Sequence, residues 1–329
     1  MKQTLRFRPD GKFKVLVFSD VHAADTLSPR TQQAIEAVVQ KEGPDLVLFN
    51  GDLNMQPVSA EEVYENTRAM TAYLEAHRIP WAHVYGNHDT EGRDGLPNLP
   101  KEEQQKIFES FSCCLSERGD PSIAGVGNYV LPILRSDSDK IAFNVWGLDS
   151  GSYLEHMRPG LYDDAVGCKE NATYNHYPFA YIPFSQISWY YHLSQEMETA
   201  NGDKIPGMMF FHMPLCEYED LARNFRSLHV HGEKLEDVCC SELNSGLFCA
   251  ALERGDIRIF VAGHDHVNDY EGEYCGIRLA YDASIGFQIY REERLMGGRV
   301  VLIDENDAAH PHTYMSYLHD IPGWRFEED

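Results

Sequence analysis

The stretch KVLVFSDVH, residues 14–22, is an unbroken apolar run that ends in an aspartate and a histidine. A continuous Val-rich run of this length predicts a strand that is buried on both faces, as in a parallel sheet. Two similar runs follow, DLVLFNGD (45–52) and PWAHVYGNHD (80–89). Each of them also ends in polar residues, so the same pattern recurs along the N-terminal part of the chain.

The segments between these runs have the periodicity and the end signals of helices. Residues 28–43 begin with Ser28 as a candidate N-cap, place Pro29 at the first helical position and end on Gly43. Residues 59–78 form an amphipathic pattern with acidic residues at its start. The β-α-β-α-β order predicts a parallel sheet with right-handed crossovers.

The rest of the chain predicts a mixture of strands and helices. Antiparallel strands are expected in GNYVLPIL and KIAFNVWGLDS, a helix in FSQISWYYHLSQEMETA, and strands in PGMMFFHMP and IRIFVAGHDH. Short β runs follow in IRLAYDAS, FQIY, GGRVVLID and HTYMSYL. Residues 151–183 are irregular, and loops of this length often rim an active site. No Gly/Ser/Pro-rich linker interrupts the chain, so we expect a single domain over residues 1–329.

The composition is that of a globular protein with a strong negative charge. The 329 residues are 43% hydrophobic and 24% charged, and the formal net charge is −24. This charge disfavours long nucleic acids and anionic membrane surfaces as partners. A small phosphorylated substrate remains compatible with it, because bound metal ions reverse the local field. The oligomeric state stays open.

The compartment is predicted from the N-terminus and the cysteines. No stretch reaches the ~20 apolar residues of a membrane span. The apolar part of the N-terminus runs directly into the first predicted core strand, unlike a signal peptide. The eight cysteines have no C-x-x-C spacing, which favours reduced thiols. We therefore expect a cytoplasmic protein.

Polar residues of one chemical type stand at the ends of five predicted strands. They are Asp20, His22, Asp52, Asn87, His88, Asp89, His212, His264 and His266. A lone histidine or a Gly-Asp pair is usually a surface residue or a turn. Together they indicate a site, because ligands of open α/β sheets bind at the carboxyl ends of the strands.

The segment GHDHVND, residues 263–269, places two histidines one residue apart after a predicted strand. On a strand, residues i and i+2 point to the same face. We therefore expect His264 and His266 to face neighbouring metal ions, one each, and Asp265 to point away.

The residue types at these strand ends predict a pair of transition metals. Imidazole and carboxylate together suit Fe, Mn or Zn and fit poorly with Ca or Mg. The candidate ligands are too many for one ion, and a carboxylate can bridge two, as in metal-pair phosphatases and nucleases. A closed structural zinc site favours cysteine ligands. No cysteine stands at a motif position, so that alternative is disfavoured.

The ordered motifs resemble those of the calcineurin-like metallophosphoesterase superfamily. The matching motifs are Asp20-x-His22, Gly51-Asp52, Gly86-Asn87-His88-Asp89, His212 and Gly263-His264-x-His266, and the resemblance runs from residue 14 to about residue 290. The flanking segments are similar to a branch labelled purple acid phosphatase-like. True purple acid phosphatases carry a tyrosine ligand three residues after the bridging aspartate. The segment Leu53, Asn54 and Met55 of this chain contains no tyrosine.

The resemblance implies a four-layer α/β/β/α sandwich, in which two mixed β-sheets are flanked by helices. It implies one metal ion bound by Asp20, His22, Asp52 and His266. It implies a second ion bound by Asp52, Asn87, His212 and His264, so that Asp52 bridges the pair.

The resemblance also implies hydrolysis of a small phosphate ester by a metal-bridging hydroxide. His88 is expected to stabilise or protonate the leaving group, and Asp89 to orient its imidazole through the other ring nitrogen. A phosphomonoesterase is favoured, and a phosphodiesterase or nucleotide pyrophosphatase is the alternative. A non-catalytic scaffold with the same fold predicts missing ligands, and none of the positions is missing here.

Overall fold

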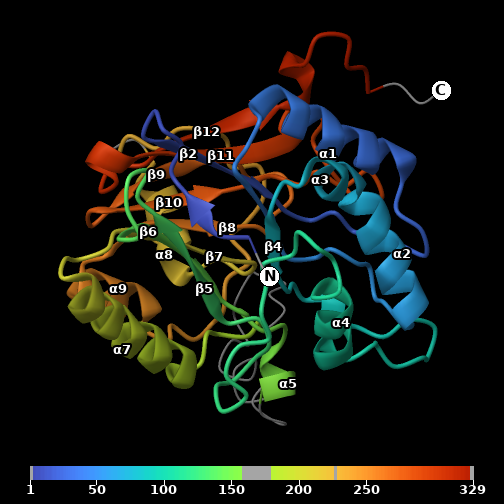
Figure 1. Ribbon diagram of the computed structural model, residues 1–329. Coiled ribbons are helices and arrows are strands. Elements are labelled where there is room, and N and C mark those ends of the chain that lie inside the picture. Colours follow the sequence, from blue (N-terminus) through green and yellow to red (C-terminus); the bar gives the residue numbers. More distant parts are fainter. Residues whose placement is uncertain (1–2, 158–178, 226–227, 327–329) are drawn as a thin grey trace.

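The computed structural model describes residues 3–157, 179–225 and 228–326 (Figure 1). One sheet has five strands, β2 (Lys12–Phe18), β3 (Leu46–Asn50), β4 (Trp81–Val84), β11 (Gly297–Asp304) and β12 (His312–Tyr317), in the order β12-β11-β2-β3-β4. The pairs β2·β3 and β3·β4 are parallel, as predicted, and β11 adds to β2 in the antiparallel sense. The sheet is therefore mixed.

The second sheet has seven strands. They are β1 (Leu5–Arg6), β5 (Tyr129–Leu134), β6 (Ile141–Gly147), β7 (Gly207–Phe211), β8 (Ile257–Ala262), β9 (Glu271–Tyr274) and β10 (Ile277–Tyr281), in the order β1-β5-β6-β7-β8-β10-β9. The expected antiparallel pair is β5 and β6, whereas β6, β7, β8 and β10 run parallel. The carboxyl ends of β7 and β8 therefore lie at one edge of this sheet.

Helices cover the outer faces of the two sheets (Figure 1). The helices are α1 (Pro29–Glu42), α2 (Ala60–Met70), α3 (Ala72–His77), α4 (Lys101–Phe108), α5 (Leu154–Met157), α7 (Phe184–Asn201), α8 (Cys216–Arg223) and α9 (Leu247–Arg254). Short 3-10 turns are η1 (His88–Thr90), η2 (Glu305–Asp307) and η3 (Leu318–Asp320). Within the described ranges, no helix is long and apolar enough to cross a membrane.

Alternate residues of the strands face different parts of the core. On β2, Val15 and Val17 pack between the two sheets. Leu16 and Phe18 pack instead against the helices α1–α4 on the outer face. A third apolar cluster lies between the seven-stranded sheet and α7, α8 and α9. Three apolar layers separate four layers of secondary structure, which confirms the predicted α/β/β/α sandwich.

Two local predictions are wrong in detail. The helix expected over residues 59–78 is divided at Thr71 into α2 and α3. The run FQIY, residues 287–290, is not a strand but a loop. Its apolar residues pack against the C-terminal tail, since Phe287 contacts Trp324 and Phe326. Tertiary contacts therefore partly bury an apolar residue of this run without placing the run in a sheet.

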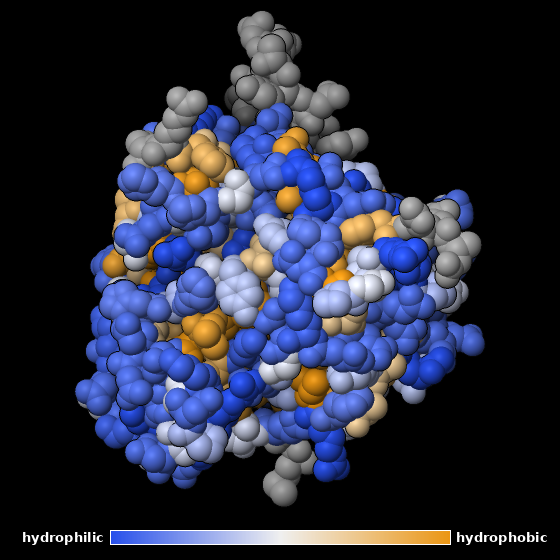
Figure 2. All heavy atoms as spheres, turned by 90° about the horizontal axis from the view of Figure 1, so that it is seen from above, coloured by the Kyte–Doolittle hydropathy of each residue, from blue (hydrophilic) through white to orange (hydrophobic). Residues whose placement is uncertain are grey.

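The visible surface is mostly hydrophilic, with apolar residues scattered among polar ones (Figure 2). This agrees with the net charge of −24 and with the deep burial of the apolar strands. The visible surface therefore gives no clue to function, and the feature that does is the cluster of buried polar residues at the strand ends.

Candidate metal centre

The predicted site residues follow the ends of strands in both sheets. Asp20 and His22 follow β2, and Asp52 follows β3. The GNHD motif follows β4, and His212 follows β7 directly. The two sheets are joined here by a parallel bridge between Ser19 and Ser284. The carboxyl edges of the two sheets therefore meet at one place.

Sharp backbone turns direct these side chains into the site. Asp20, His22, Asp52 and His264 all have positive φ angles, of 54°, 48°, 50° and 73°. Such angles are uncommon for residues other than glycine and are costly unless the surrounding structure enforces them. Hydrogen bonds enforce them here, because His22 N–H donates to the carbonyl of Asp52 over 2.9 Å. The strained backbone supports a functional role for these positions.

The first cluster consists of Asp20, His22 and His266, and all three side chains are buried. The Nε2 atoms of the two histidines lie 3.1 Å apart. Asp20 Oδ1 lies 3.6 Å from Nε2 of His22 and 3.4 Å from Nε2 of His266. Donor atoms bound to one ion at about 2.0–2.2 Å lie roughly 3–3.5 Å apart. The observed separations fit a shared metal ion.

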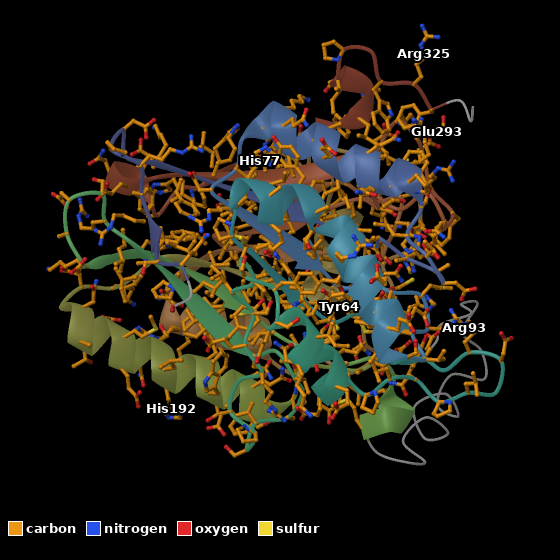
Figure 3. The ribbon with its side chains drawn as sticks, turned by 45° about the vertical axis from the view of Figure 1, so that its right-hand side comes forward. Tyr64, His77, Arg93, His192, Glu293 and Arg325 are labelled. Atoms are coloured by element: carbon orange, nitrogen blue, oxygen red, sulfur yellow. The ribbon has the colours of Figure 1, made fainter. Side chains whose placement is uncertain are left out.

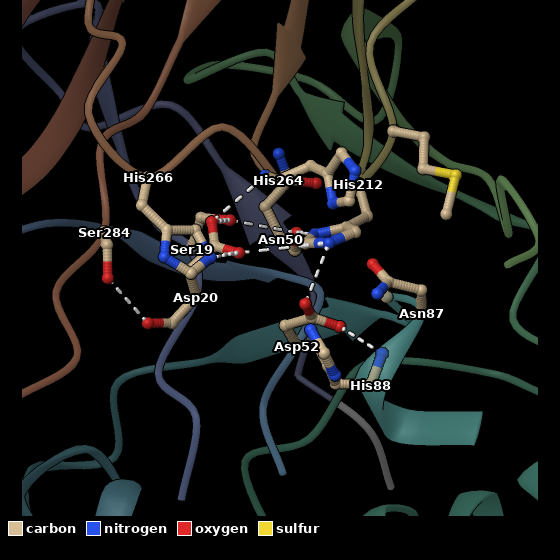
Figure 4. Close-up of polar contacts among 12 residues, drawn as sticks. Ser19, Asp20, Asn50, Asp52, Asn87, His88, His212, His264, His266 and Ser284 are labelled. Atoms are coloured by element: carbon tan, nitrogen blue, oxygen red, sulfur yellow. Dashed lines mark hydrogen bonds and ion pairs between the residues drawn. The ribbon is translucent and has the colours of Figure 1, made fainter. Parts of the chain in front are cut away.

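The second cluster consists of Asp52, His212 and His264. His212 Nε2 lies 3.2 Å from Asp52 Oδ2, and the rings of His212 and His264 have centroids 5.0 Å apart. Asn87 stands beside this cluster in the close-up (Figure 4). Three imidazole or carboxylate donors therefore converge at a second position.

Asp52 connects the two clusters. Its Oδ2 lies 3.2 Å from His212 Nε2 and 3.6 Å from His22 Nε2. Its Oδ1 accepts a hydrogen bond from His88 N–H over 2.8 Å. Figure 4 shows the carboxylate between His212 and His88, with a contact to each. One oxygen of Asp52 thus faces both clusters while the other is held by the backbone.

Several of these donor atoms are buried without a hydrogen-bond partner. They are Asp20 Oδ1, Asp52 Oδ2, Asn87 Oδ1, His212 Nε2 and His264 Nε2. Buried polar atoms are nearly always satisfied in folded proteins, and each exception needs an explanation. Nitrogen and oxygen donors of this kind fit Fe, Mn or Zn. The residues therefore fit a pair of transition metals.

Backbone carbonyls fix the histidine rings. His212 Nδ1–H donates to the carbonyl of Asn50 over 2.8 Å, and His266 Nδ1–H donates to the carbonyl of Tyr290 over 3.2 Å. Each bond places the proton on Nδ1 and leaves Nε2 facing the cluster. This is the usual support of a metal-binding histidine.

Burial and charge set the protonation of the cluster. Burial raises the pKa of Asp52, but the charges of His212 and His88 outweigh it and hold that pKa well below its ordinary value. Burial lowers the pKa of His212, but the carboxylates of Asp52 and Asp20 outweigh it and raise the pKa to about 10. Burial lowers the pKa of His264 to about 3. Asp52 is therefore an anion and His264 a neutral imidazole, the forms that bind metals.

His88 differs from the predicted ligands. Its side chain is 25% exposed, whereas His22, Asp52 and His212 are almost fully buried. Burial lowers the pKa of His88, but the charge of Asp52 and the hydrogen bond to Glu91 raise it to about 9. His88 therefore holds a proton at neutral pH, and its side chain is partly open to solvent.

The predicted role of Asp89 is wrong. Its carboxylate does not orient His88, because it accepts hydrogen bonds from the backbone N–H groups of Asn54 over 2.8 Å and Gly86 over 2.9 Å. The partner of His88 Nδ1 is Glu91, at 2.9 Å. In the 3-10 turn η1, the side chains of His88 and Asp89 point in different directions. Asp89 instead connects the loops that follow β3 and β4 through its hydrogen bonds from Asn54 and Gly86.

The reason given for the GHDHVND prediction is wrong, although its two histidines do belong to different donor clusters. Strand β8 ends at Ala262, so His264 and His266 are not on a strand. A turn with positive φ at His264 directs the two rings to different clusters. The carboxylate of Asp265 accepts hydrogen bonds from Tyr281 Oη–H over 2.5 Å and from Cys239 N–H. It belongs to neither cluster, although one of its oxygens lies within 4.8 Å of a ring nitrogen of His264.

The segment 151–183 contacts the centre in its described parts. Tyr153 Oη lies 3.2 Å from Asn87 Nδ2, and the ring of Phe179 lies edge-on to His264 with centroids 4.5 Å apart. Residues 158–178 lie outside the described residues. Both ends of the segment therefore reach the predicted ligands.

Three contacting residues were missed by sequence reasoning. Glu91 and Phe179 are described above, and Tyr290 stacks on His266 with ring centroids 4.2 Å apart. Only Glu91 carries a sequence signal, since it lies within the loop that begins at the GNHD motif. By contrast, His77 and His192, which were left out of the site, lie on the outer helices α3 and α7 (Figure 3).

Gly86→Ala is expected to disrupt the centre without changing any donor. An added Cβ would lie 2.0 Å from Asp52 Oδ1 and 2.5 Å from its backbone nitrogen, so Asp52 must move. We expect the affinity for Mn²⁺ to fall at least about 10-fold, measured as loss of the Mn²⁺-induced rise in melting temperature. The control is Gly43→Ala, which lowers stability through the positive φ of 55° but meets nothing within 4 Å, so its Mn²⁺-induced rise should stay that of the wild type. Retention of the full Mn²⁺ effect in Gly86→Ala would contradict this packing.

The family is identified by comparison with known sequences. Residues 13–268 match the calcineurin-like phosphoesterase family, Metallophos, and the chain belongs to this family. The predicted resemblance is thereby confirmed at the level of the family.

Curated relatives with names span most of the chain. Probable inactive purple acid phosphatase 29 of Arabidopsis thaliana is 28% identical over 93% of this chain and 80% of its own length. Probable inactive purple acid phosphatase 14 of the same plant is 28% identical over 88% of this chain and 74% of its own length. Phosphatase DCR2 of Saccharomyces cerevisiae is 28% identical over 82% of this chain, but this covers only 46% of the yeast protein.

A solved structure shares the fold. A dimetal phosphatase from Danio rerio aligns with a TM-score of 0.57 over 92% of this chain and 98% of its own chain. The sequences are only 14% identical, so the likeness concerns the fold.

Proposed function

We propose that this chain is a metal-dependent phosphoesterase that hydrolyses a small phosphate ester with two metal ions. The observation that carries this proposal is the set of buried donor atoms without hydrogen-bond partners, which converge in two clusters around Asp52. Such atoms are costly in a folded protein unless another group satisfies them. Two metal ions held by these donors, with Asp52 contributing to both, would satisfy them together.

The donors divide between two ions. We assign Asp20, His22, Asp52 and His266 to one ion, and Asp52, Asn87, His212 and His264 to the other. The imidazole-rich set favours Fe, Mn or Zn. When bound, such ions supply an activated water as nucleophile and neutralise charge on the phosphate.

His88 is the proposed general acid. Its Nδ1–H is held by Glu91 at 2.9 Å, so Nε2 is the nitrogen that faces a bound substrate. Its ring lies edge-on to His22 with centroids 5.1 Å apart, which keeps it beside the first cluster. A proton on Nε2 can pass to the leaving oxygen as the ester bond breaks, a contribution of about 10²–10⁴-fold.

The competing hypothesis is a non-catalytic scaffold with the same fold. The word "inactive" in the names of the two Arabidopsis relatives favours it. Loss of catalysis in a metal-dependent fold is expected to leave gaps in the ligand set. In this chain every predicted ligand position carries a metal-binding side chain. The complete set favours an active enzyme, in keeping with the name of the yeast relative.

The substrate class follows from charge and from the relatives. The net charge of −24 disfavours a long nucleic acid. The phosphatase names of the relatives favour a phosphomonoester over a phosphodiester or a nucleotide pyrophosphate. A small phosphorylated molecule is therefore the proposed substrate.

Removal of the metals is expected to abolish hydrolysis reversibly. Treatment with a chelator should eliminate turnover of p-nitrophenyl phosphate, and addition of Mn²⁺, Fe²⁺ or Zn²⁺ should restore it, because the donors have no other role to play. Elemental analysis should find close to two transition-metal ions per chain. Bis(p-nitrophenyl) phosphate should be the slower substrate.

Two results would change the proposal. Faster hydrolysis of the bis-ester would make the chain a phosphodiesterase. Fewer than one tightly bound metal ion, together with no chelator-sensitive activity on either ester, would favour the scaffold.

A further inference from the structure

Glu91 contacts two side chains of the GNHD motif that have different roles. Its Oε2 accepts hydrogen bonds from His88 Nδ1–H over 2.9 Å and from Gln56 Nε2–H over 2.8 Å. Its Oε1 accepts from Tyr153 Oη–H over 2.6 Å and lies 3.5 Å from Asn87 Nδ2. Asn87 Nδ2–H also donates to Tyr153 Oη over 3.2 Å. One carboxylate therefore reaches both Asn87 and His88.

The carboxylate determines which end of the Asn87 amide faces the metal clusters. A carboxylate only accepts hydrogen bonds, so the amide group that faces it must be the NH₂. Tyr153 enforces the same direction, because its hydroxyl gives its proton to Glu91 and leaves its oxygen to accept from Asn87. The amide oxygen therefore points the other way, where it is buried without a hydrogen-bond partner. A reversed amide would present NH₂, which cannot bind a metal.

The same carboxylate determines the tautomer of His88. Because Glu91 only accepts, Nδ1 must carry a proton, and Nε2 is turned away from Glu91. The same carboxylate also receives hydrogen bonds from Gln56 and Tyr153, so these contacts are all with donor groups.

We propose that Glu91 is a positioning residue that directs the oxygen of Asn87 to a metal ion and Nε2 of His88 to the substrate. The proposal rests on the proposed function, since it deepens the roles assigned there. Glu91 itself belongs to neither of the donor clusters around Asp52. It acts through Asn87 and His88, and Gln56 donates to Oε2, the same oxygen that His88 contacts.

Glu91→Gln is the direct test, because it keeps the size of the side chain and replaces one acceptor by a donor. The new NH₂ must face either His88 Nδ1–H or the Tyr153 and Asn87 pair. We expect the affinity for the more weakly held Mn²⁺ ion to fall about 10–100-fold, measured by calorimetric titration of the metal-free protein.

The second readout compares leaving groups. We expect the turnover number to fall more for phenyl phosphate than for p-nitrophenyl phosphate, because the less acidic alcohol depends more on protonation as it leaves. A role in folding alone would lower both rates equally. The melting temperature of the metal-free variant checks that the fold is kept.

A second variant separates the two functions of Glu91. Tyr153→Phe removes the hydroxyl between Glu91 and Asn87 but leaves the bond to His88. It should weaken Mn²⁺ binding without changing the ratio of rates between the two esters. The matched control is Glu65→Gln, which changes an exposed glutamate paired with Arg68 and should alter neither readout.

Wild-type Mn²⁺ affinity together with an unchanged ratio of rates in Glu91→Gln would overturn the proposal. The metal titration remains decisive even if the wild-type chain hydrolyses neither ester. Wild-type protein that binds no pair of metal ions would instead reject the proposed function.

Discussion

Asp52→Asn is expected to abolish hydrolysis and to remove the stabilisation that metals give to the fold. The asparagine oxygen must accept the hydrogen bond from His88 N–H, now 2.8 Å from Oδ1. Its NH₂ then takes the place of Oδ2, between His212 Nε2 at 3.2 Å and His22 Nε2 at 3.6 Å. An NH₂ group cannot bind a metal, so both clusters lose their shared anion. The loss of several kcal/mol of charge stabilisation corresponds to at least about 10³-fold in kcat/KM.

The measurement combines turnover with thermal unfolding in increasing Mn²⁺. A ligand that binds only the native state raises the melting temperature by mass action. The wild-type protein should show this rise, and Asp52→Asn should show almost none. Asp139→Asn is the control, because Asp139 is an exposed residue that pairs with Arg6 at the surface. A normal Mn²⁺-dependent rise in Asp52→Asn would show that the two clusters do not share this ligand.

The N-terminal part of the fold could be predicted because its signals are local. The stretch VLVF, residues 15–18, is buried on both faces in β2, as an unbroken apolar run indicates. Ser28 accepts a hydrogen bond from Arg30 N–H over 3.2 Å, and Gly43 ends the helix with a φ of 55°. Caps and apolar runs express physical preferences of a few neighbouring residues, so sequence alone reveals them.

The loop at residues 287–290 could not be predicted because its structure depends on distant partners. Its β-like run packs against the C-terminal tail, and Tyr290 then stacks on His266. Neither contact can be predicted from the residues close to this loop in the sequence. The second sheet likewise depends on crossovers between distant strands, and only the resemblance to a family predicted it.

The residue types of the site could be predicted, whereas the directions of their side chains could not. Asp, His and Asn at strand ends indicate metal chemistry without a structure. Yet Asp89 faces the backbone of neighbouring loops, while Glu91 holds His88. The 3-10 turn and the positive φ angles decide these directions, and adjacency in sequence does not reveal them. The motif therefore predicts for Asp89 a contact with His88 that Glu91 makes, two residues later in the chain.

His88→Ala is expected to lower the turnover number about 10²–10⁴-fold while both metal ions stay bound. The donor atoms of His88, His22 and Asp52 lie within 4.8 Å of one another, so geometry alone also permits His88 to be a ligand. Two observations favour the role of general acid over that of metal ligand. Its Nδ1 is occupied by Glu91, and its side chain is 25% exposed, whereas His22 is buried.

Metal content and leaving-group dependence together distinguish these roles. If His88 is the acid, His88→Ala should keep the metal content of the wild type and lose more activity on phenyl phosphate than on p-nitrophenyl phosphate. If it is a ligand, the metal content should fall and both esters should lose activity in the same proportion. Activity equal to that of the wild type on both esters would remove His88 from the mechanism. Glu91→Gln should reproduce the leaving-group effect of His88→Ala in weaker form, because it misdirects the same imidazole without removing it.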